Sequence, residues 1–352
     1  MESNIIELKK MISKIRRSSL IKIKPEKCII CNRKISSTCK SHSVPQFILK
    51  NISSNGNLYN WNKMIGIPII DNNKGIREAN VFRKICNECD NTRFKEYETP
   101  DNYKKNISNV MLYQISIKIL LNNIYTREAS VALTNEYIEQ MIEDDTLKKI
   151  YYRAAERFQI DSEKMTIDEE YRKLKLLINS SSDKIKYKII FTHKLSYVVP
   201  YAFQDEIVLV SDMVGGRINN IFSKDKKYLM QSIKICIFPM KDETFILMYR
   251  DQKDTRYNRF ERQFCKLSLE NKLALINYIV FLYSEKFLIS DKIDSKAFET
   301  NITKYTAITQ HNINFDNEDP YTKEFRLMYR LDKFKQCENL LLEKYALIDD
   351  NH

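Results

Sequence analysis

The spacing of apolar and polar residues separates helical from extended segments along the chain. Over residues 3–20, apolar side chains recur every three or four positions with lysine and arginine between them, which predicts a basic amphipathic helix. The stretch NVMLYQISIKILLNNIY at 109–125 is apolar on most faces, as in a helix that is buried all round. Two further helical patterns follow, at 134–158 and 168–180. We therefore expect a helical segment over residues 106–180.

Beyond residue 183 the pattern becomes that of strands followed by helices. Four stretches rich in β-branched and aromatic residues predict strands, namely IKYKIIFTH at 185–193, EIVLVSD at 206–212, SIKICIFP at 232–239 and TFILMYR at 244–250. Residues 267–287 predict a helix with Ser268 as its N-cap and Glu270 in its first turn. Residues 321–347 predict another amphipathic helix.

Residues 25–105 follow neither pattern for long. NISSNGNLYN is rich in turn residues, WNKMIGIPII at 61–70 predicts a strand interrupted by glycine and proline, and residues 85–98 return to a helical spacing. The chain as a whole therefore predicts an α+β protein with four parts. These are a basic amphipathic helix at 1–24, a small module at 25–105, a helical segment at 106–180, and a mixed α/β domain of unassigned role at 181–352.

Positive charge is concentrated in the first third of the chain. Residues 1–105 contain 21 lysines and arginines against 10 aspartates and glutamates, a net charge of +11, whereas the whole chain carries +12. A positively charged region of this kind is typical of proteins that bind a phosphate backbone. We therefore expect a nucleic acid as the partner, and DNA rather than RNA. A solvated basic face or a surface for an acidic protein partner would give the same charge pattern.

The chain has no feature of a membrane or secreted protein. It lacks a run of about 18 apolar residues, so we expect no transmembrane helix and no membrane partner. The N-terminus is basic but has neither the apolar core nor the cleavage site of a signal peptide, which predicts a cytoplasmic protein. Cytosolic thiols stay reduced, so closely spaced cysteines there favour metal or redox chemistry over disulfides.

Two cysteine pairs predict a metal site. CIIC places Cys28 and Cys31 at two-residue spacing, and CNEC does the same for Cys86 and Cys89, with 54 residues between the pairs. Four thiolates are the usual closed ligand set of a tetrahedral structural Zn²⁺, so we expect zinc, with redox pairs as the alternative. The remaining cysteines are expected to be free thiols; they are Cys39, Cys236, Cys265 and Cys337.

Residues next to the pairs add hydrolytic chemistry. His42 follows the first pair, and Asp90 and Asn91 follow the second pair directly. An imidazole can deprotonate water near neutral pH, and a carboxylate or amide oxygen can hold Mg²⁺ or Mn²⁺ against a phosphate. A histidine that caps a turn or donates to a cysteine sulfur is the structural alternative. His193 and His311 have no such neighbours and are expected to be structural.

Read together, CIIC, SHSVPQFIL and CNECDNTRFKEYE resemble the zinc-stapled branch of the HNH endonucleases, over about residues 25–100. The resemblance implies a ββα-metal, treble-clef-like module in which His42 is the general base and Asp90 or Asn91 binds the catalytic ion. It leaves the central asparagine open among Asn51, Asn55, Asn57, Asn60 and Asn62. Two departures are visible: Ser41 stands where many relatives carry an acid before the histidine, and Asp90 stands where they carry asparagine or histidine. The first departure implies a weaker metal site, a different ligand, or a module that binds without cutting.

The resulting hypothesis is a metal-dependent HNH-like endonuclease that hydrolyses phosphodiester bonds, and by analogy a bacterial antiviral defence effector. The phosphate contacts expected beside the site are Lys34, Lys40, Arg83, Lys84, Arg93 and Lys95. The alternative is a non-catalytic zinc module that binds nucleic acid or a protein partner. In either case the domain at 181–352 would recognise substrate, form a homo-oligomer or bind a partner; a separate activity in residues 184–290 is a third possibility, for which we find no catalytic motif.

Overall fold

A computed structural model describes residues 2–53, 55–59, 73–143, 145–155, 161–221, 223, 225, 227–293 and 329–347. The described chain forms two compact units. Residues 2–43 and 80–185 belong to the N-terminal unit, and residues 44–59, 73–79 and 186–347 belong to the C-terminal unit. The chain thus leaves the N-terminal unit after Ser43 and returns to it at residue 80. The domain boundaries predicted after residues 24, 105 and 180 stay predictions.

The N-terminal unit begins with the predicted basic helix. Helix α1 spans Glu2–Lys22, and a short antiparallel pair follows, in which β1 (Ser41–His42) lies beside β4 (Val81–Phe82). The predicted helical pattern at 85–98 forms two short helices, α4 (Asn87–Arg93) and α5 (Lys95–Glu98). The order of these elements is therefore strand, strand, helix, with a cysteine pair before the first strand and another at the start of α4.

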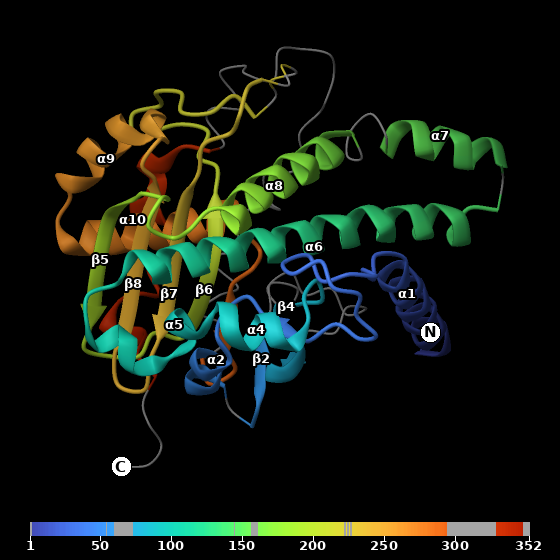
Figure 1. The fold of residues 1–352 in the computed structure, drawn as a ribbon, viewed down its shortest axis with the longest axis horizontal. Coiled ribbons are helices and arrows are strands. Elements are labelled where there is room, and N and C mark those ends of the chain that lie inside the picture. The colour runs from blue at the N-terminus through green and yellow to red at the C-terminus, as the bar shows by residue number, and fades with distance from the viewer. Residues whose placement is uncertain are drawn as a thin grey trace. The chain divides into compact units, whose positions relative to one another are not determined.

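Long helices make up the rest of this unit (Figure 1). Helix α6 runs unbroken over Asn109–Met141, and α7 (Asp145–Ala155) and α8 (Asp161–Asn179) follow. The pattern predicted at 109–125 lies within α6, and the one predicted at 134–158 is divided between the end of α6 and α7; residues 126–133 are mostly good helix formers, so α6 continues through them. The Ser108 hydroxyl accepts from the Met111 amide at 3.1 Å and so caps the N-terminus of α6. The side chain of Arg127 on α6 pairs with Glu163 and Glu170 on α8.

The C-terminal unit is built on one antiparallel sheet, in the described residues ordered β3-β2-β9-β6-β7-β8-β5. Figure 1 shows β5, β8, β7 and β6 side by side in this order. The strands are β2 (Asn57–Tyr59), β3 (Asn73–Gly75), β5 (Tyr187–Leu195), β6 (Tyr201–Ile207), β7 (Ile233–Pro239), β8 (Thr244–Asp251) and β9 (Leu288–Ser290). Three of the four predicted strands are confirmed as β5, β7 and β8. The strand predicted within 61–70 lies outside the described residues.

The strand predicted at 206–212 is wrong for most of its length. Strand β6 ends at Ile207, and the chain then enters a turn in which the Asp212 amide donates to the Gly216 carbonyl at 2.8 Å. Gly215 has a φ of +82°, which favours glycine at this position. An apolar run such as IVLV has no alternation, so periodicity alone could not place the strand within it.

Helices α9 (Asn258–Cys265) and α10 (Leu269–Tyr283) share a core with one face of the sheet, and α2 (Gln46–Ile52) packs against β6, β7 and β9 outside that core. The predicted helix near 267–287 is confirmed as α10. As expected, the Ser268 hydroxyl caps α10, accepting from the Asn271 amide at 3.3 Å. Side chains of β7, β8, α9 and α10 share one buried core; examples are Ile235, Met248, Phe260, Ile276 and Ile279.

The helix predicted at 321–347 is wrong for the described part, residues 329–347. Only two 3-10 turns form there, Leu331–Gln336 and Glu343–Tyr345. The Asn339 side chain accepts from the Leu341 amide at 3.1 Å, which offers the backbone an alternative to a helical hydrogen bond. The Leu340 amide in turn donates to the Asn277 side chain at 3.1 Å. The apolar residues of this segment are therefore buried from an irregular backbone.

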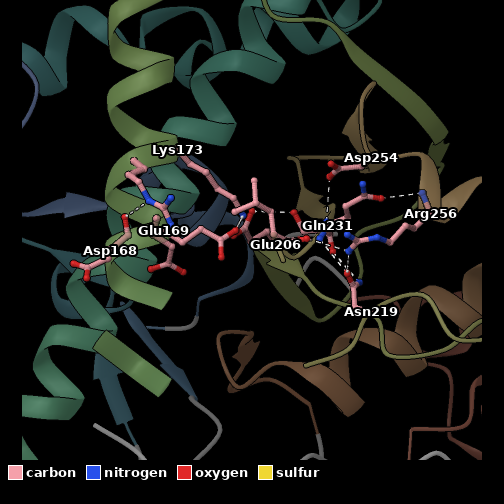
Figure 2. Close-up of polar contacts among 12 residues, drawn as sticks. Asp168, Glu169, Lys173, Glu206, Asn219, Gln231, Asp254 and Arg256 are labelled. Carbon is pink, nitrogen blue, oxygen red and sulfur yellow. Dashed lines mark hydrogen bonds and ion pairs between the residues drawn. The ribbon is translucent and has the colours of Figure 1, made fainter. Parts of the chain in front are cut away.

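A buried polar network fixes the loop between β6 and β7 (Figure 2). The Asn219 amide donates to the Leu209 carbonyl at 2.9 Å and to the Gln231 carbonyl at 3.0 Å, and its oxygen accepts from Arg256 at 3.0 Å. The backbone N–H of Arg256 also donates to the side-chain oxygen of Gln231 at 2.8 Å. These groups satisfy one another, so we assign the network a structural role.

No helix among the described residues combines the length and the apolar character needed to cross a bilayer.

Candidate metal centre and functional site

The two cysteine pairs converge on one point. The Sγ atoms of Cys28, Cys31, Cys86 and Cys89 all lie within 4.8 Å of one another. Ligands at Zn–S distances of about 2.3 Å in a tetrahedron are separated by about 3.8 Å, so the cluster matches the spacing that zinc requires. The Cys31 and Cys86 sulfurs are already 3.9 Å apart. The chain can therefore hold a structural Zn²⁺ at this cluster.

Local backbone geometry positions the first pair. The Cys28 amide donates to the Arg33 carbonyl at 2.9 Å, and the Asn32 amide donates to the Cys28 carbonyl at 2.8 Å. Asn32 has a φ of +58°, a left-handed conformation that asparagine tolerates and that reverses the chain just after Cys31. This tight turn lets both sulfurs face the same point. The second pair is held differently, because Cys86 lies at the N-terminus of α4 and Cys89 lies in its first turn.

Neighbouring donors affect the thiols unequally. The Arg33 guanidinium donates to the Cys31 sulfur at 3.3 Å, and this hydrogen bond lowers the pKa of the Cys31 thiol to about 6. The Cys86 amide donates to the Cys28 sulfur at 3.4 Å, but burial outweighs it and raises the pKa of the Cys28 thiol. Since a metal binds the thiolate form, the hydrogen bond from Arg33 favours the form of Cys31 that binds an ion. With four protein sulfurs the site has no open position, so zinc here would be structural.

A second cluster surrounds Asp90. Its carboxylate accepts from the Ser41 hydroxyl at 2.6 Å and lies 2.8 Å from the Lys118 ammonium. Lys118 comes from the N-terminal third of α6, is 1% exposed, and also pairs with Glu98 at 2.8 Å. It donates further to the Ser41 hydroxyl at 2.7 Å and to the His42 carbonyl at 3.3 Å. We call Ser41, Asp90, Glu98 and Lys118 the Lys118 cluster.

The Lys118 cluster determines what Asp90 can do. The Asp90 Oδ1 atom already accepts hydrogen bonds from the Lys118 ammonium and the Ser41 hydroxyl. A divalent ion at this oxygen would have to displace the ammonium or lie close to its positive charge. Within the described residues the four cysteines form the only group of three or more histidine, cysteine or acidic side chains spaced to hold a metal. The expected role of Asp90 as a ligand of a catalytic ion stays a prediction, and this geometry weighs against it.

His42 occupies the position next to Ser41 on β1. Successive side chains of a strand point to opposite faces, and Ser41 uses the face toward Asp90, so we expect the His42 imidazole on the other face. His42 is half-buried, and Asn91 is exposed on α4. Of the asparagines considered for the central position, Asn51 donates to the Pro239 carbonyl at 3.0 Å, and Asn60 and Asn62 lie outside the described residues.

The predicted phosphate contacts fall into two groups. Arg83 is half-buried, and four others are exposed, namely Lys34, Lys40, Arg93 and Lys95. Lys84 differs, because it is 4% exposed, forms an ion pair with Glu128 on α6, and donates to the Ile23 carbonyl at 3.1 Å. Lys84 therefore connects the end of α1 to α6. Because its ammonium is buried, Lys84 does not belong to the surface that could contact phosphate.

Sequence reasoning missed two features of this unit. The first is Lys118, whose signal was visible as the only charge in NVMLYQISIKILLNNIY, since a lone charge on an otherwise buried helix needs a partner. The second is a basic groove along α1, which includes Arg16, Arg17 and Lys24. These cations lay within the predicted basic helix, but nothing in the sequence indicated which element they face.

Comparison with known proteins adds no relative: no protein-family model matches the chain, and searches of curated proteins and of solved structures find no match.

Proposed function

We propose that the chain binds nucleic acid through a zinc-stapled module in its N-terminal unit. The observation that carries the proposal is the four-cysteine cluster set within the most basic part of the chain. A closed zinc site offers no catalysis of its own and serves to hold a small fold together. What this fold presents to solvent is mainly cationic.

The exposed cations support a phosphate ligand. Lys34 and Lys40 follow the first cysteine pair, and Arg93 and Lys95 belong to α4 and α5, after the second pair. Cations on elements joined by one metal keep fixed spacings, as a regular phosphate backbone requires. Exposed cations held together on one small fold support a nucleic acid as the ligand.

The Lys118 cluster supports binding over cleavage. A hydrolytic ion needs hard oxygen ligands that are free to reach it, whereas Asp90 is bound by the buried Lys118 ammonium. Ser41, which stands where many HNH relatives carry an acid, is part of the same cluster. The ββα order of β1, β4 and α4 fits a treble-clef-like module used as a scaffold.

The test of binding is a charge reversal on the module. At about 100 mM salt, Arg93→Glu with Lys95→Glu should weaken binding of a labelled DNA by about tenfold or more, because two phosphate contacts become repulsive. The matched control is Arg262→Glu with Lys266→Glu, an equal charge change on the exposed side of α9 in the C-terminal unit. Fluorescence anisotropy over a salt series measures both. Absence of any salt-dependent binding of DNA or RNA by the zinc-loaded protein would overturn the proposal.

Phosphodiester cleavage is the second candidate, and the position of His42 favours it. This histidine lies in β1, paired with β4 and followed by α4, the order that the HNH resemblance implies. In that reading His42 activates water, and Asp90 or Asn91 contributes to a Mg²⁺ or Mn²⁺ site that stabilises the charge on the phosphate.

The cleavage candidate predicts nicking of supercoiled plasmid by the zinc-loaded protein with Mg²⁺ or Mn²⁺. His42→Ala should reduce the nicking rate by about a hundredfold or more, as expected for loss of a general base. His193→Ala, a histidine of β5 in the C-terminal unit, should leave the rate unchanged. If the parent protein binds plasmid without nicking it, or if His42→Ala nicks at the parental rate, the candidate is rejected.

A further inference from the structure

A groove of about 530 Å³ lies on the N-terminal unit, away from the Lys118 cluster. Its walls come from the C-terminal half of α1, the loop before β1, the end of β4 and helix α6. The lining residues are Ser13, Arg16, Arg17, Leu20, Ile21, Lys24, Ser37, Thr38, Arg83 and Tyr125. A volume of this size is typical of sites for small ligands, for which about 300–1,000 Å³ is usual.

The charged residues that line the groove are all positive. Arg16, Arg17 and Lys24 are exposed, and Arg83, the residue directly after β4, lines the groove and is half-buried. No acidic side chain is found among the lining residues that the structure describes, and Arg16, Arg17 and Lys24 form no ion pair with a described carboxylate. A groove lined by cations of one sign raises the local concentration of anions, so an anionic ligand suits it.

The same groove is partly apolar. Leu20 and Ile21 line it from α1 and Tyr125 lines it from α6, and Ile21 is 66% exposed. A bare phosphate needs no such surface. A nucleotide does, because it combines an anionic phosphate with a flat base that stacks on aromatic and aliphatic side chains. Ser37 and Thr38 add hydroxyl groups that can bond to the sugar or the phosphate.

The walls of the groove are fixed before any ligand arrives. Lys84 holds the Ile23 carbonyl at the end of α1 and pairs with Glu128 on α6. Lys22, the residue before Ile23, pairs with Glu136 on α6, and Ser18, one helical turn before Lys22, donates to the same carboxylate at 2.6 Å. Helix α1 is thus held to α6 at two places, and its cations need little ordering on binding, which reduces the entropic cost.

We propose that this groove binds an unpaired nucleotide of a single-stranded nucleic acid. The backbone phosphates lie against Arg16, Arg17 and Lys24, and one base packs on Tyr125 and Leu20. A duplex keeps its base faces stacked inside, so it can reach the cations but not the apolar part of the groove. The inference rests on the proposed function and adds to it a preference for single strands, at a surface separate from Arg93 and Lys95.

The experiment compares a labelled single strand with a duplex of equal length at one salt concentration. The variants are Arg16→Glu with Arg17→Glu, Tyr125→Leu and Tyr125→Phe, with Arg262→Glu and Lys266→Glu as the charge control. We expect the parent protein to bind the single strand more tightly. The α1 double variant should lose at least tenfold in single-strand affinity. Tyr125→Leu should lose about fivefold or more, and Tyr125→Phe should bind normally, because a phenyl ring still stacks.

Zinc content and melting temperature of each variant establish that it is folded, and Arg16 and Arg17 are exposed enough to change without loss of core packing. If single strand and duplex bind alike, and the α1 variant matches the charge control, the groove proposal is overturned while nucleic-acid binding stands. If the parent protein binds neither, the proposed function fails first. If it binds anionic lipid vesicles through the α1 cations and no oligonucleotide, α1 is a membrane-contact helix and the groove proposal is likewise wrong.

Discussion

Replacing either Cys28 or Cys89 with serine is expected to abolish stoichiometric zinc binding and to unfold much of the N-terminal unit. Both side chains are buried, at 1% and 5% exposure, so neither can be replaced by a water ligand from bulk solvent. Structural zinc binds its peptides with an apparent free energy of about 10–16 kcal/mol, all of which contributes to folding when no site exists in the unfolded chain. A zinc ion at this cluster would close a separation of 54 residues between the pairs. Metal analysis by mass spectrometry and calorimetric unfolding measure the two effects.

Cys265→Ser is the control for this experiment. Cys265 is exposed at the end of α9 in the C-terminal unit, so its loss should change neither the zinc content nor the melting temperature. The parent protein should contain one zinc per chain and lose it to a strong chelator together with the cooperative unfolding of the N-terminal unit. A Cys28→Ser protein that keeps one zinc, or a parent protein that melts identically without metal, would contradict the assignment.

The features that sequence alone predicted are those with local causes. The cysteine pairs were found because two-residue spacing is a property of one turn, and α10 was found because Ser268 caps a long apolar pattern. Strands β7 and β8 were found because their β-branched and aromatic residues are contiguous. In each case the deciding interactions lie within a few residues of the chain.

The features that sequence missed depend on distant partners. The pairing of Ser41 with Lys118 spans 77 residues, and β2 pairs with β9, where Leu58 faces Ser290. No periodicity encodes such a partner. The same holds for the tail at 329–347, where Asn277 on α10 accepts from the Leu340 amide and stabilises an irregular backbone over a helix. The sequence therefore identified the candidate site by its ligands but could not say which side chains would neutralise Asp90.

Replacing Lys118 with methionine is expected to destabilise the N-terminal unit by about 3–5 kcal/mol, a fall in melting temperature of about 10 °C. Methionine fills a similar volume beside the rings of Phe82 and Phe94, so the main loss is electrostatic. The carboxylates of Asp90 and Glu98 would be left partly buried without their shared cation. Lys104→Met is the control, since it removes a fully solvated pair with Asp101 on the surface of the same unit and should cost about 0.5 kcal/mol or less.

The pH dependence distinguishes lost charge from lost packing. Burial already raises the pKa of Glu98, with Lys118 opposing it, and removing the ammonium raises it further. A carboxyl whose pKa is higher in the folded state than in the unfolded state holds its proton more tightly in the folded state. The free energy of unfolding therefore falls as the pH rises and the carboxyl ionises. The Lys118→Met defect should therefore be larger at pH 7 than at pH 5, and Asp90→Asn with Glu98→Gln in the same chain should recover much of it. A defect that is equal at both pH values and unrelieved by the amides would show that Lys118 serves packing alone, and Asp90 would again be a candidate ligand for a catalytic ion.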